Sequence, residues 1–189
     1  MISIGIDLSL TKTGYAIVSS GGEDGKGIVI SSGVIKSKPC GDLPIHEITR
    51  ISKILDELNE KVNDGVDQDP DIVAIEGLAF MAKGTSLVQL AGLNYMLRAS
   101  LMISDWKFII VAPTTLKKFI TGSGKGDKDM MMLNVYKNYG FDSLDNNEAD
   151  AFALAACGLA TIGSPICKLG APQKEVINLL SKQLCKKEK

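Results

Sequence analysis

The sequence predicts an α/β protein in which one mixed β-sheet is covered by helices. Three runs with strand character, separated by short turns, open the chain, and such a series favours an antiparallel meander. Further along, strand-like runs alternate with amphipathic helical patterns, which is typical of a sheet whose later strands are connected by helices. The 189 residues contain no internal repeat and no interdomain linker, so these elements are expected to share one core.

The first three strands are predicted over residues 1–8, 14–20 and 27–36. Residues 1–8 alternate isoleucine or leucine at even positions with smaller or acidic residues at odd positions, as a strand with two different faces does. The odd-numbered face carries Asp7. The stretch SGGEDGKG, which separates the second and third strands, has the composition of a turn.

The rest of the chain predicts helices that alternate with two more strands. Apolar residues recur at helical spacing in the helical segments, and the run DPDIVAIE opens its strand with a proline turn. The expected ranges are helices at 45–63, 85–103, near 127–139 and near 147–161, and strands that end at Glu76 and Pro113. The order is therefore β-β-β-α-β-α-β-α-α. A last amphipathic segment over 172–187 is expected to be a peripheral or frayed helix.

Composition argues against several classes of protein. Apolar runs are interrupted well before about 18 residues, so no membrane span is expected, and no signal peptide is recognisable at the N-terminus. His46 is the only histidine, which excludes sites that need two histidines and argues against a Ser-His-Asp triad. The four cysteines lack metal-binding spacing. They are interpreted as reduced thiols, which favours a cytoplasmic protein.

Charge is unevenly distributed although the net charge is only −1. Residues 107–137 carry six lysines and two aspartates, whereas residues 142–150 carry four acidic residues and no basic one. A basic strip beside an acidic cluster suits a metal-dependent nuclease, because lysines attract phosphate and carboxylates hold cations. Ordinary solvated helix faces produce the same pattern, so it does not decide the function by itself.

Three carboxylates are candidate metal ligands. Asp7 lies in the first strand and Glu76 ends the fourth, and acids at such positions often have no functional role. Asp150 is the strongest of the three candidates, because its neighbours in the helix are mostly alanine, leucine and phenylalanine. A carboxylate in a buried helix is unfavourable unless a cation, either a metal ion or a lysine, pairs with it.

The remaining acids of the last helix have a structural explanation. Asp145 can cap the helix, and Glu148 can reach back to it in a capping box. If Asp7, Glu76 and Asp150 converge, their mutual repulsion favours hard divalent cations such as Mg²⁺ or Mn²⁺. Two such ions suit phosphodiester hydrolysis, since one activates the attacking water and the other stabilises the leaving oxygen.

Four segments resemble the RuvC family, the Holliday junction resolvases of bacteria and phages within the RNase H-like superfamily. GIDLSLTKTGYAI resembles the first strand pair of that family, and AIEGLAFMAKGTSLVQLAGL resembles its second acidic motif. VAPTTLKKFITGSGKGDKDMM is similar to its lysine-bearing segment, and NNEADAFALA to its final acidic helix. The segments follow the family's order from residue 1 to about residue 160.

The resemblance implies an RNase H-like nuclease domain over residues 1–165. Its sheet would have five strands, three antiparallel and then two parallel, flanked by helices. Residues 166–189 lie beyond the resemblance and are expected to form a tail that is helical or partly disordered.

The resemblance also implies roles for single residues. Asp7, Glu76 and Asp150 would hold the metal, expected to be two Mg²⁺ ions that Mn²⁺ can replace. Lys117 and Lys128 would be catalytic lysines that contact phosphate or polarise the reacting groups.

Asn147 stands three residues before Asp150, where the family usually has an acidic residue or a histidine. The spacing keeps the two side chains on one helix face, so the amide oxygen of Asn147 is a further candidate ligand. Asp145 and Glu148 are the alternatives for completing the metal site. DNA contacts are expected from an aromatic side chain that stacks on bases and from basic side chains. These predicted contacts are Phe80, Lys83, Lys118 and Lys125.

The implied activity is metal-dependent endonuclease cleavage of four-way and other branched DNA, which leaves 5′-phosphate and 3′-hydroxyl ends. Symmetric cleavage of a two-fold symmetric junction needs two active sites and hence a homodimer, with helix 85–103 as a candidate interface. The expected partners are branched DNA and a second copy of the chain, with no membrane. The expected location is the cytoplasm of a bacterium or of a phage-infected cell.

Other functions stay open at this point. GIDLSLTKTGYAI also resembles the phosphate loop of actin-like ATPases and sugar kinases, but those proteins are much longer and have a second such motif. A member of the RNase H-like superfamily that acts on RNA is a related possibility. A non-catalytic protein that binds branched DNA is the third, because Asn147 brings no charge to the metal site.

Overall fold

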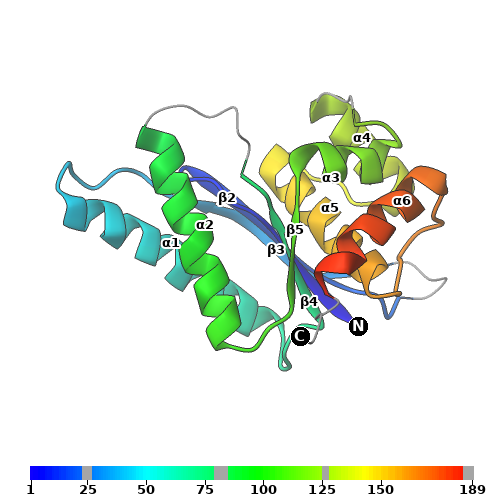
Figure 1. The fold of residues 1–189 in the computed structure, drawn as a ribbon, viewed down its shortest axis with the longest axis horizontal. Helices are drawn as coiled ribbons and strands as arrows, with labels where there is room; N and C mark the ends of the chain where they lie inside the picture. The colour runs from blue at the N-terminus through cyan, green and yellow to red at the C-terminus, as the bar shows by residue number, and fades with distance from the viewer. Residues whose placement is uncertain (23–26, 79–84, 125–127, 185–189) are drawn as a thin grey trace.

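The structure is a computed structural model that describes residues 1–22, 27–78, 85–124 and 128–184. Its strands form one sheet in the order β3-β2-β1-β4-β5, with helices on both faces (Figure 1). The strands are β1 (Ile2–Asp7), β2 (Lys12–Ser19), β3 (Ile28–Lys36), β4 (Ile72–Glu76) and β5 (Phe108–Val111). The helices are α1 (Pro44–Gly65), α2 (Thr85–Ile103), α3 (Pro113–Thr121), α4 (Lys128–Tyr139), α5 (Asn146–Thr161) and α6 (Ala171–Leu180).

The strand directions confirm the predicted fold class. β1 pairs antiparallel with β2, and β2 pairs antiparallel with β3. β4 lies on the other side of β1 and runs parallel to it, and β5 runs parallel to β4. The chain therefore builds three antiparallel strands and then two parallel ones, as the order of strands and helices in the sequence predicts.

Each face of the sheet has its own hydrophobic core. α1 and α2 cover the face that carries Ile2, Ile4 and Ile6 of β1. α5 crosses the opposite face, where it packs on β1 and β2 and is flanked by α3, α4 and α6. Every residue of β1 is consequently buried, so the odd-numbered face of this strand is covered by a helix rather than by water.

The sequence pattern does not reveal one of the helices. Pro113 ends the predicted fifth strand, and it also starts α3 as one of the first helical residues. Proline is well suited to that position, because the first turn of a helix has no partner for its backbone N–H groups. Leu116, Phe119 and Ile120 then bury one face of α3. The helix continues directly from the edge of the sheet at which β5 ends.

The segment after residue 165 contributes to the core. Val176 and Leu180 of α6 are buried, and a 3-10 turn follows at Ser181–Gln183. The side-chain amide of Gln183 donates to Ile110 O and accepts from Ile110 N, both at 2.9 Å. It thereby occupies backbone groups that an edge strand would otherwise leave open. The division of the chain into a domain and a tail at residue 165 stays a prediction.

Helices long and apolar enough to cross a membrane are absent from the part of the chain that the structure describes.

Candidate active site

Two adjacent parallel strands bring two acids to the same edge of the sheet. The register of β1 and β4 pairs Ile6 with Ile75, so the next residues, Asp7 and Glu76, are neighbours where both strands end. Ile6 and Ile75 belong to the core under α1 and α2. Because side chains alternate along a strand, both carboxylates point to the opposite face, which α5 covers. Asp7 is buried, with 7% of its surface exposed.

Glycines in the first two strands let α5 approach this face closely. A Cβ atom on Gly5 would lie 1.9 Å from the carbonyl oxygen of Ala151, and one on Gly14 would lie 2.0 Å from that of Asn147. Only residues without a side chain leave room for the helix backbone at these points. The contact brings the N-terminal half of α5, with Asn147 and Asp150, next to the strand that carries Asp7.

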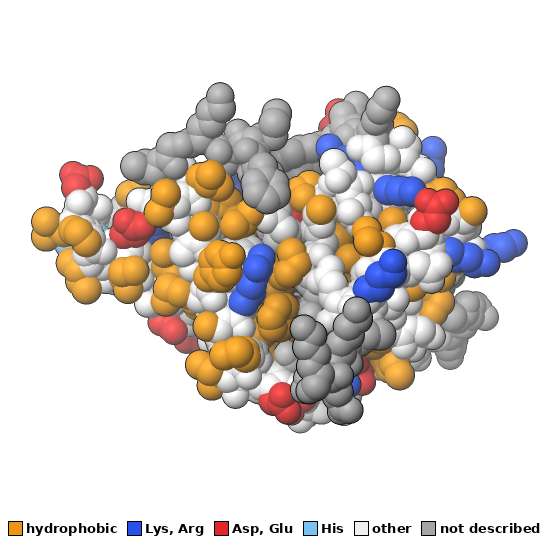
Figure 2. Space-filling model, in the orientation of Figure 1, with side chains coloured by type: hydrophobic (Ala, Val, Ile, Leu, Met, Phe, Trp, Pro, Cys, Tyr) orange, Lys and Arg blue, Asp and Glu red, His pale blue; other side chains and the backbone are white. Residues whose placement is uncertain are grey.

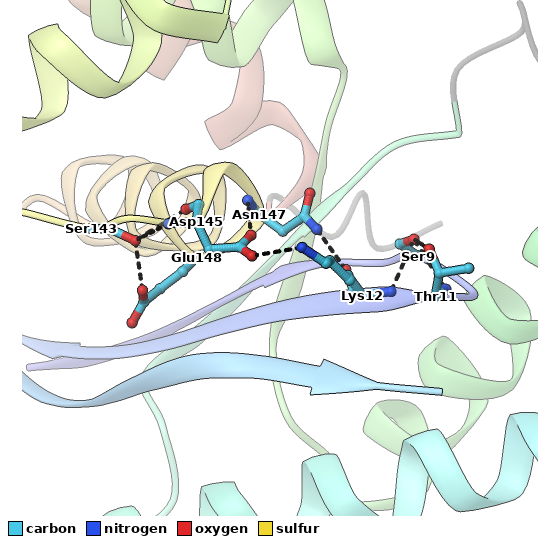
Figure 3. Close-up of polar contacts among 7 residues, drawn as sticks. All are labelled: Ser9, Thr11, Lys12, Ser143, Asp145, Asn147 and Glu148. Carbon is cyan, nitrogen blue, oxygen red and sulfur yellow. Dashed lines mark hydrogen bonds and ion pairs between the residues drawn. The ribbon is translucent and has the colours of Figure 1, made fainter. Parts of the chain in front are cut away.

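The start of α5 is fixed by hydrogen bonds and one ion pair (Figure 3). Asp145 caps the helix by accepting from Asn147 N at 3.0 Å, and its other oxygen pairs with Lys12 Nζ at 3.1 Å. Burial raises the pKa of Asp145, but the hydrogen bond from Asn147 N and the Lys12 ammonium outweigh it, so that the pKa lies below its usual value. Asn147 Nδ2 donates to the carbonyl oxygen of Lys12 at 3.0 Å. The amide oxygen of Asn147 points away from Lys12 in Figure 3.

Of the two interactions in the predicted capping box, the structure confirms the cap by Asp145, and the predicted contact of Glu148 is wrong. Asp145 caps the helix as expected, but Glu148 does not reach back to the backbone of Asp145. Its carboxylate instead accepts from Ser32 Oγ at 2.7 Å and from Ser143 Oγ at 2.6 Å, and Asp145 N donates to Ser143 Oγ. Glu148 therefore ties α5 to β3, and these contacts account for both of its oxygens.

The predicted acids and one predicted lysine line a single pocket of about 290 Å³. α3 contributes Lys117 and the buried, apolar Leu116, and α4 contributes the buried Met131. The residues that line the pocket are Asp7, Ser9, Glu76, Pro113, Leu116, Lys117, Met131, Asn147 and Asp150. Side chains separated by more than a hundred positions in the sequence thus face one another at the carboxyl edge of the sheet.

Other predicted site residues are not brought to this pocket by the described structure. Lys118 of α3 forms an ion pair with Glu175 of α6. Phe80, Lys83 and Lys125 lie outside the described residues, as does the side chain of Lys128, the first residue of α4. Their roles stay predictions.

The oxygen donors of the pocket fit a hard divalent cation. Three carboxylates and one amide oxygen are the ligand types that Mg²⁺ and Mn²⁺ prefer, and no thiol or imidazole of the described residues lines the pocket. Among the described residues, no three Asp, Glu, His or Cys side chains already form a cluster that could hold a metal ion. The chemical type of the donors therefore supports metal binding, although the side chains are not arranged as a ligand sphere.

Sequence reasoning misses two residues that support the site. Ser9 follows Asp7 and lines the pocket, and Thr13 Oγ1 bonds both the N–H and the carbonyl of Ser9 across the turn. Asn94 of α2 is buried, and its Nδ2 donates to the carbonyl oxygen of Glu76 at 3.3 Å. The sequence offers one signal for Asn94, which is a single amide among leucines at helical spacing.

A sheet of this order, with α5 across it and acids at one edge, defines the RNase H-like class of fold. A family model described as crossover junction endodeoxyribonuclease RuvC matches residues 3–158. The protein of that name from Anaeromyxobacter sp. (strain Fw109-5) is 31% identical over 160 residues, covering 85% of this chain and 73% of the relative. The one from Corynebacterium diphtheriae is 30% identical over 159 residues, covering 82% and 91%. The chain belongs to the RuvC family.

Solved structures support the same fold. A structure of Thermus thermophilus RuvC in complex with Holliday junction substrate superposes with a TM-score of 0.66 at 20% identity, covering 87% of this chain and 97% of that one. Fowlpox virus resolvase in complex with Holliday junction DNA gives a TM-score of 0.51 at 15% identity, covering 82% and 94%. At these identities the likeness concerns the fold.

Proposed function

We propose that this chain is a crossover junction endodeoxyribonuclease, which hydrolyses phosphodiester bonds in four-way and other branched DNA. The observation that carries the proposal is the pocket shared by Asp7, Glu76, Asp150 and Lys117 in a chain of the RuvC family. The substrate class follows from the names of the relatives and from the Holliday junction in the Thermus complex. Because bacterial DNA lies in the cytoplasm, we propose that compartment for the activity.

Asp7, Glu76 and Asp150 hold the metal in this proposal, with the amide oxygen of Asn147 as a neutral fourth ligand. Mg²⁺ is the proposed ion, Mn²⁺ can replace it, and two ions share the site. Metal ions bound by these residues would supply activation of the attacking water and stabilisation of the charge on the leaving oxygen. The cleaved strand would carry a 5′-phosphate and a 3′-hydroxyl.

The other residues of the site act on the DNA itself. Lys117 lines the same pocket as the acids, where its ammonium can pair with the phosphate whose charge grows during the reaction. Leu116 and Met131 add apolar side chains to the lining of the pocket, and such a lining strengthens each electrostatic contact there. Lys128 is a second proposed catalytic lysine. The further proposed DNA contacts are Phe80, Lys83, Lys118 and Lys125.

A homodimer would present two such pockets to a two-fold symmetric junction. Figure 2 shows hydrophobic side chains gathered over α2 and the adjoining α1. The hydrophobic side chains of α2 include Val88, Tyr95 and Met102, each more than 60% exposed. We propose that this face joins two copies of the chain. The mass in solution checks the arrangement, and a monomer under conditions that support paired cuts would contradict it.

Cleavage of a labelled synthetic four-way junction in the presence of Mg²⁺ or Mn²⁺ tests the proposed activity. The expected result is a pair of symmetric cuts in strands of like polarity, with little cutting of a linear DNA duplex. Preferential cutting of an RNA duplex would instead favour a nuclease that acts on RNA. Tight junction binding without any cleavage would favour a non-catalytic branched-DNA-binding protein.

Lys117→Ala is expected to slow cleavage at saturating junction by at least about tenfold, because one charge-stabilising donor is removed from the reacting phosphate. Single-turnover rates measure the effect. Lys137→Ala is the matched control, since Lys137 is exposed on α4 and does not line the pocket. An unchanged rate for Lys117→Ala would mean that Lys117 is only a surface charge.

A further inference from the structure

We propose that a basic pocket between β3 and α1 binds a second backbone phosphate of the DNA, away from the phosphate that reacts. The inference rests on the proposed function and adds a binding subsite to it. The pocket has a volume of about 230 Å³, and its charged lining consists of four basic side chains and one acidic side chain. These are Lys36, Lys38, Arg50, Lys53 and Glu57.

Arg50 is the fixed part of this subsite. Its residue surface is only 9% exposed. Nε donates to Ser37 Oγ at 3.0 Å, and Nη2 donates to the carbonyl oxygen of Leu10. Both acceptors are neutral, and within the described ranges Arg50 forms no ion pair with a carboxylate. A buried charge is usually paired, so an external anion is the natural complement of this guanidinium.

The basic pocket lies at the same end of the sheet as the carboxylate pocket. β1 and β3 both run antiparallel to β2, so Asp7 and Lys36 end their strands on the same side of the molecule. Arg50 binds the carbonyl of Leu10, which is in the turn directly after Ser9 of the carboxylate pocket. The β1–β2 turn therefore connects the two pockets, and a strand held in one can extend toward the other.

A DNA phosphate fits the pocket better than other anions of similar charge. The chain as a whole has a net charge of −1, so the positive potential here is local and not a general property of the surface. A guanidinium with exposed lysines around it matches the geometry and charge of a phosphodiester. Branched DNA also supplies many phosphates at regular spacing beside the one that is cut, so both pockets can be filled at once.

The test uses Lys38→Ala and Lys53→Ala, singly and together, because both lysines are exposed and truncating them leaves the core intact. Binding of a fluorescent four-way junction is measured by anisotropy in EDTA over a series of NaCl concentrations. For the double variant, Kd is expected to rise at least tenfold at low salt. The slope of log K against log[salt] is expected to become shallower by about 0.9 for each phosphate that the protein no longer neutralises. Lys174→Ala on α6, which lies on the other face of the sheet, is the matched control with no expected change.

Glu57→Gln is expected to change Kd for the junction in the opposite direction to the lysine variants. A misfolded variant would not bind the junction more tightly. Removal of the one acid from the pocket is expected to tighten junction binding. An unchanged Kd and salt slope in the lysine double variant would overturn the inference, as would weaker binding by Glu57→Gln. If the unaltered chain neither binds nor cuts the junction, the proposed function itself fails. If it cuts normally and the double variant binds normally, only the second phosphate subsite fails.

Discussion

Asp7→Asn is expected to abolish cleavage of a four-way junction without weakening junction binding. The substitution keeps the shape of a buried side chain but removes one of the charges that would hold the metal. Metal ions supply several kcal/mol of transition-state stabilisation, and about 1.4 kcal/mol corresponds to a factor of ten in rate, so the rate should fall by at least about 100-fold. Binding should be unchanged or tighter, because an acid near phosphate is gone. Single-turnover cleavage and anisotropy measure the two effects separately.

Asp56→Asn is the matched control for this prediction. Asp56 is exposed on α1 and undergoes the same change from acid to amide. Junction cleavage and junction binding should therefore both stay at the level of the unaltered chain. A thermal unfolding curve for Asp7→Asn shows whether the fold is retained. Normal cleavage by a folded Asp7→Asn protein would remove Asp7 from the site and, with it, the reason to expect metal at this edge of the sheet.

Most of the fold can be predicted, because its pattern lies in short stretches of sequence. The alternating isoleucines of β1 and the helical spacing in α1 each reflect burial of one face by a neighbouring layer. α3 is not predicted, because Pro113 follows the strand-like run of β5 and also begins α3. In the sequence the proline indicates only that the strand ends. Its amphipathic run, with Leu116, Phe119 and Ile120, is too short for its helical period to stand out.

The acids of the site can be named from the sequence, but their convergence cannot be derived from it. Asp150 follows a local signal, because its apolar helix neighbours make a carboxylate unfavourable, whereas Asp7 and Glu76 stand at strand positions where acids often have no functional role. Their proximity depends on which helix crosses which strand, and family resemblance supplies this expectation. Glu148 shows the limit of local reasoning, because one of its two partners, Ser32, lies 116 positions away, whereas a capping box joins residues only three positions apart.

Arg50 and Asn94 escape sequence reasoning for a related reason. Arg50 looks like an ordinary polar position in an amphipathic helix, and the single amide of Asn94 among leucines does not indicate which group it binds. Their importance comes from backbone carbonyls of distant segments, Leu10 O for Arg50 and Glu76 O for Asn94. No sequence period reveals which carbonyl a buried polar side chain will meet, since that depends on the packing of helices against loops.

Gly5→Ala is expected to destabilise the fold and to reduce cleavage together. The new methyl group would lie 1.9 Å from Ala151 O and 2.5 Å from Ala155 N. Both atoms belong to the backbone of α5, so no side-chain rotation relieves the overlap and the helix must move away from β1. Overpacking of this kind costs about 1–3 kcal/mol in unfolding free energy, sometimes more, which corresponds to roughly 2–4 °C in Tm per kcal/mol for a chain of this size.

The same displacement would carry Asp150 away from Asp7, because Asp150 immediately precedes Ala151 on α5. Cleavage by the folded fraction should therefore fall even at temperatures well below Tm, which a purely global decrease in stability does not predict. Gly92→Ala is the matched control: among the described residues its Cβ would meet only Ile51 Cδ1, at 3.6 Å, and alanine within a helix is favoured over glycine by up to about 1 kcal/mol. Denaturant unfolding and single-turnover rates on both variants decide the matter. Unchanged stability and activity in Gly5→Ala would mean that α5 does not approach β1 as closely as the joint positioning of Asp7 and Asp150 requires.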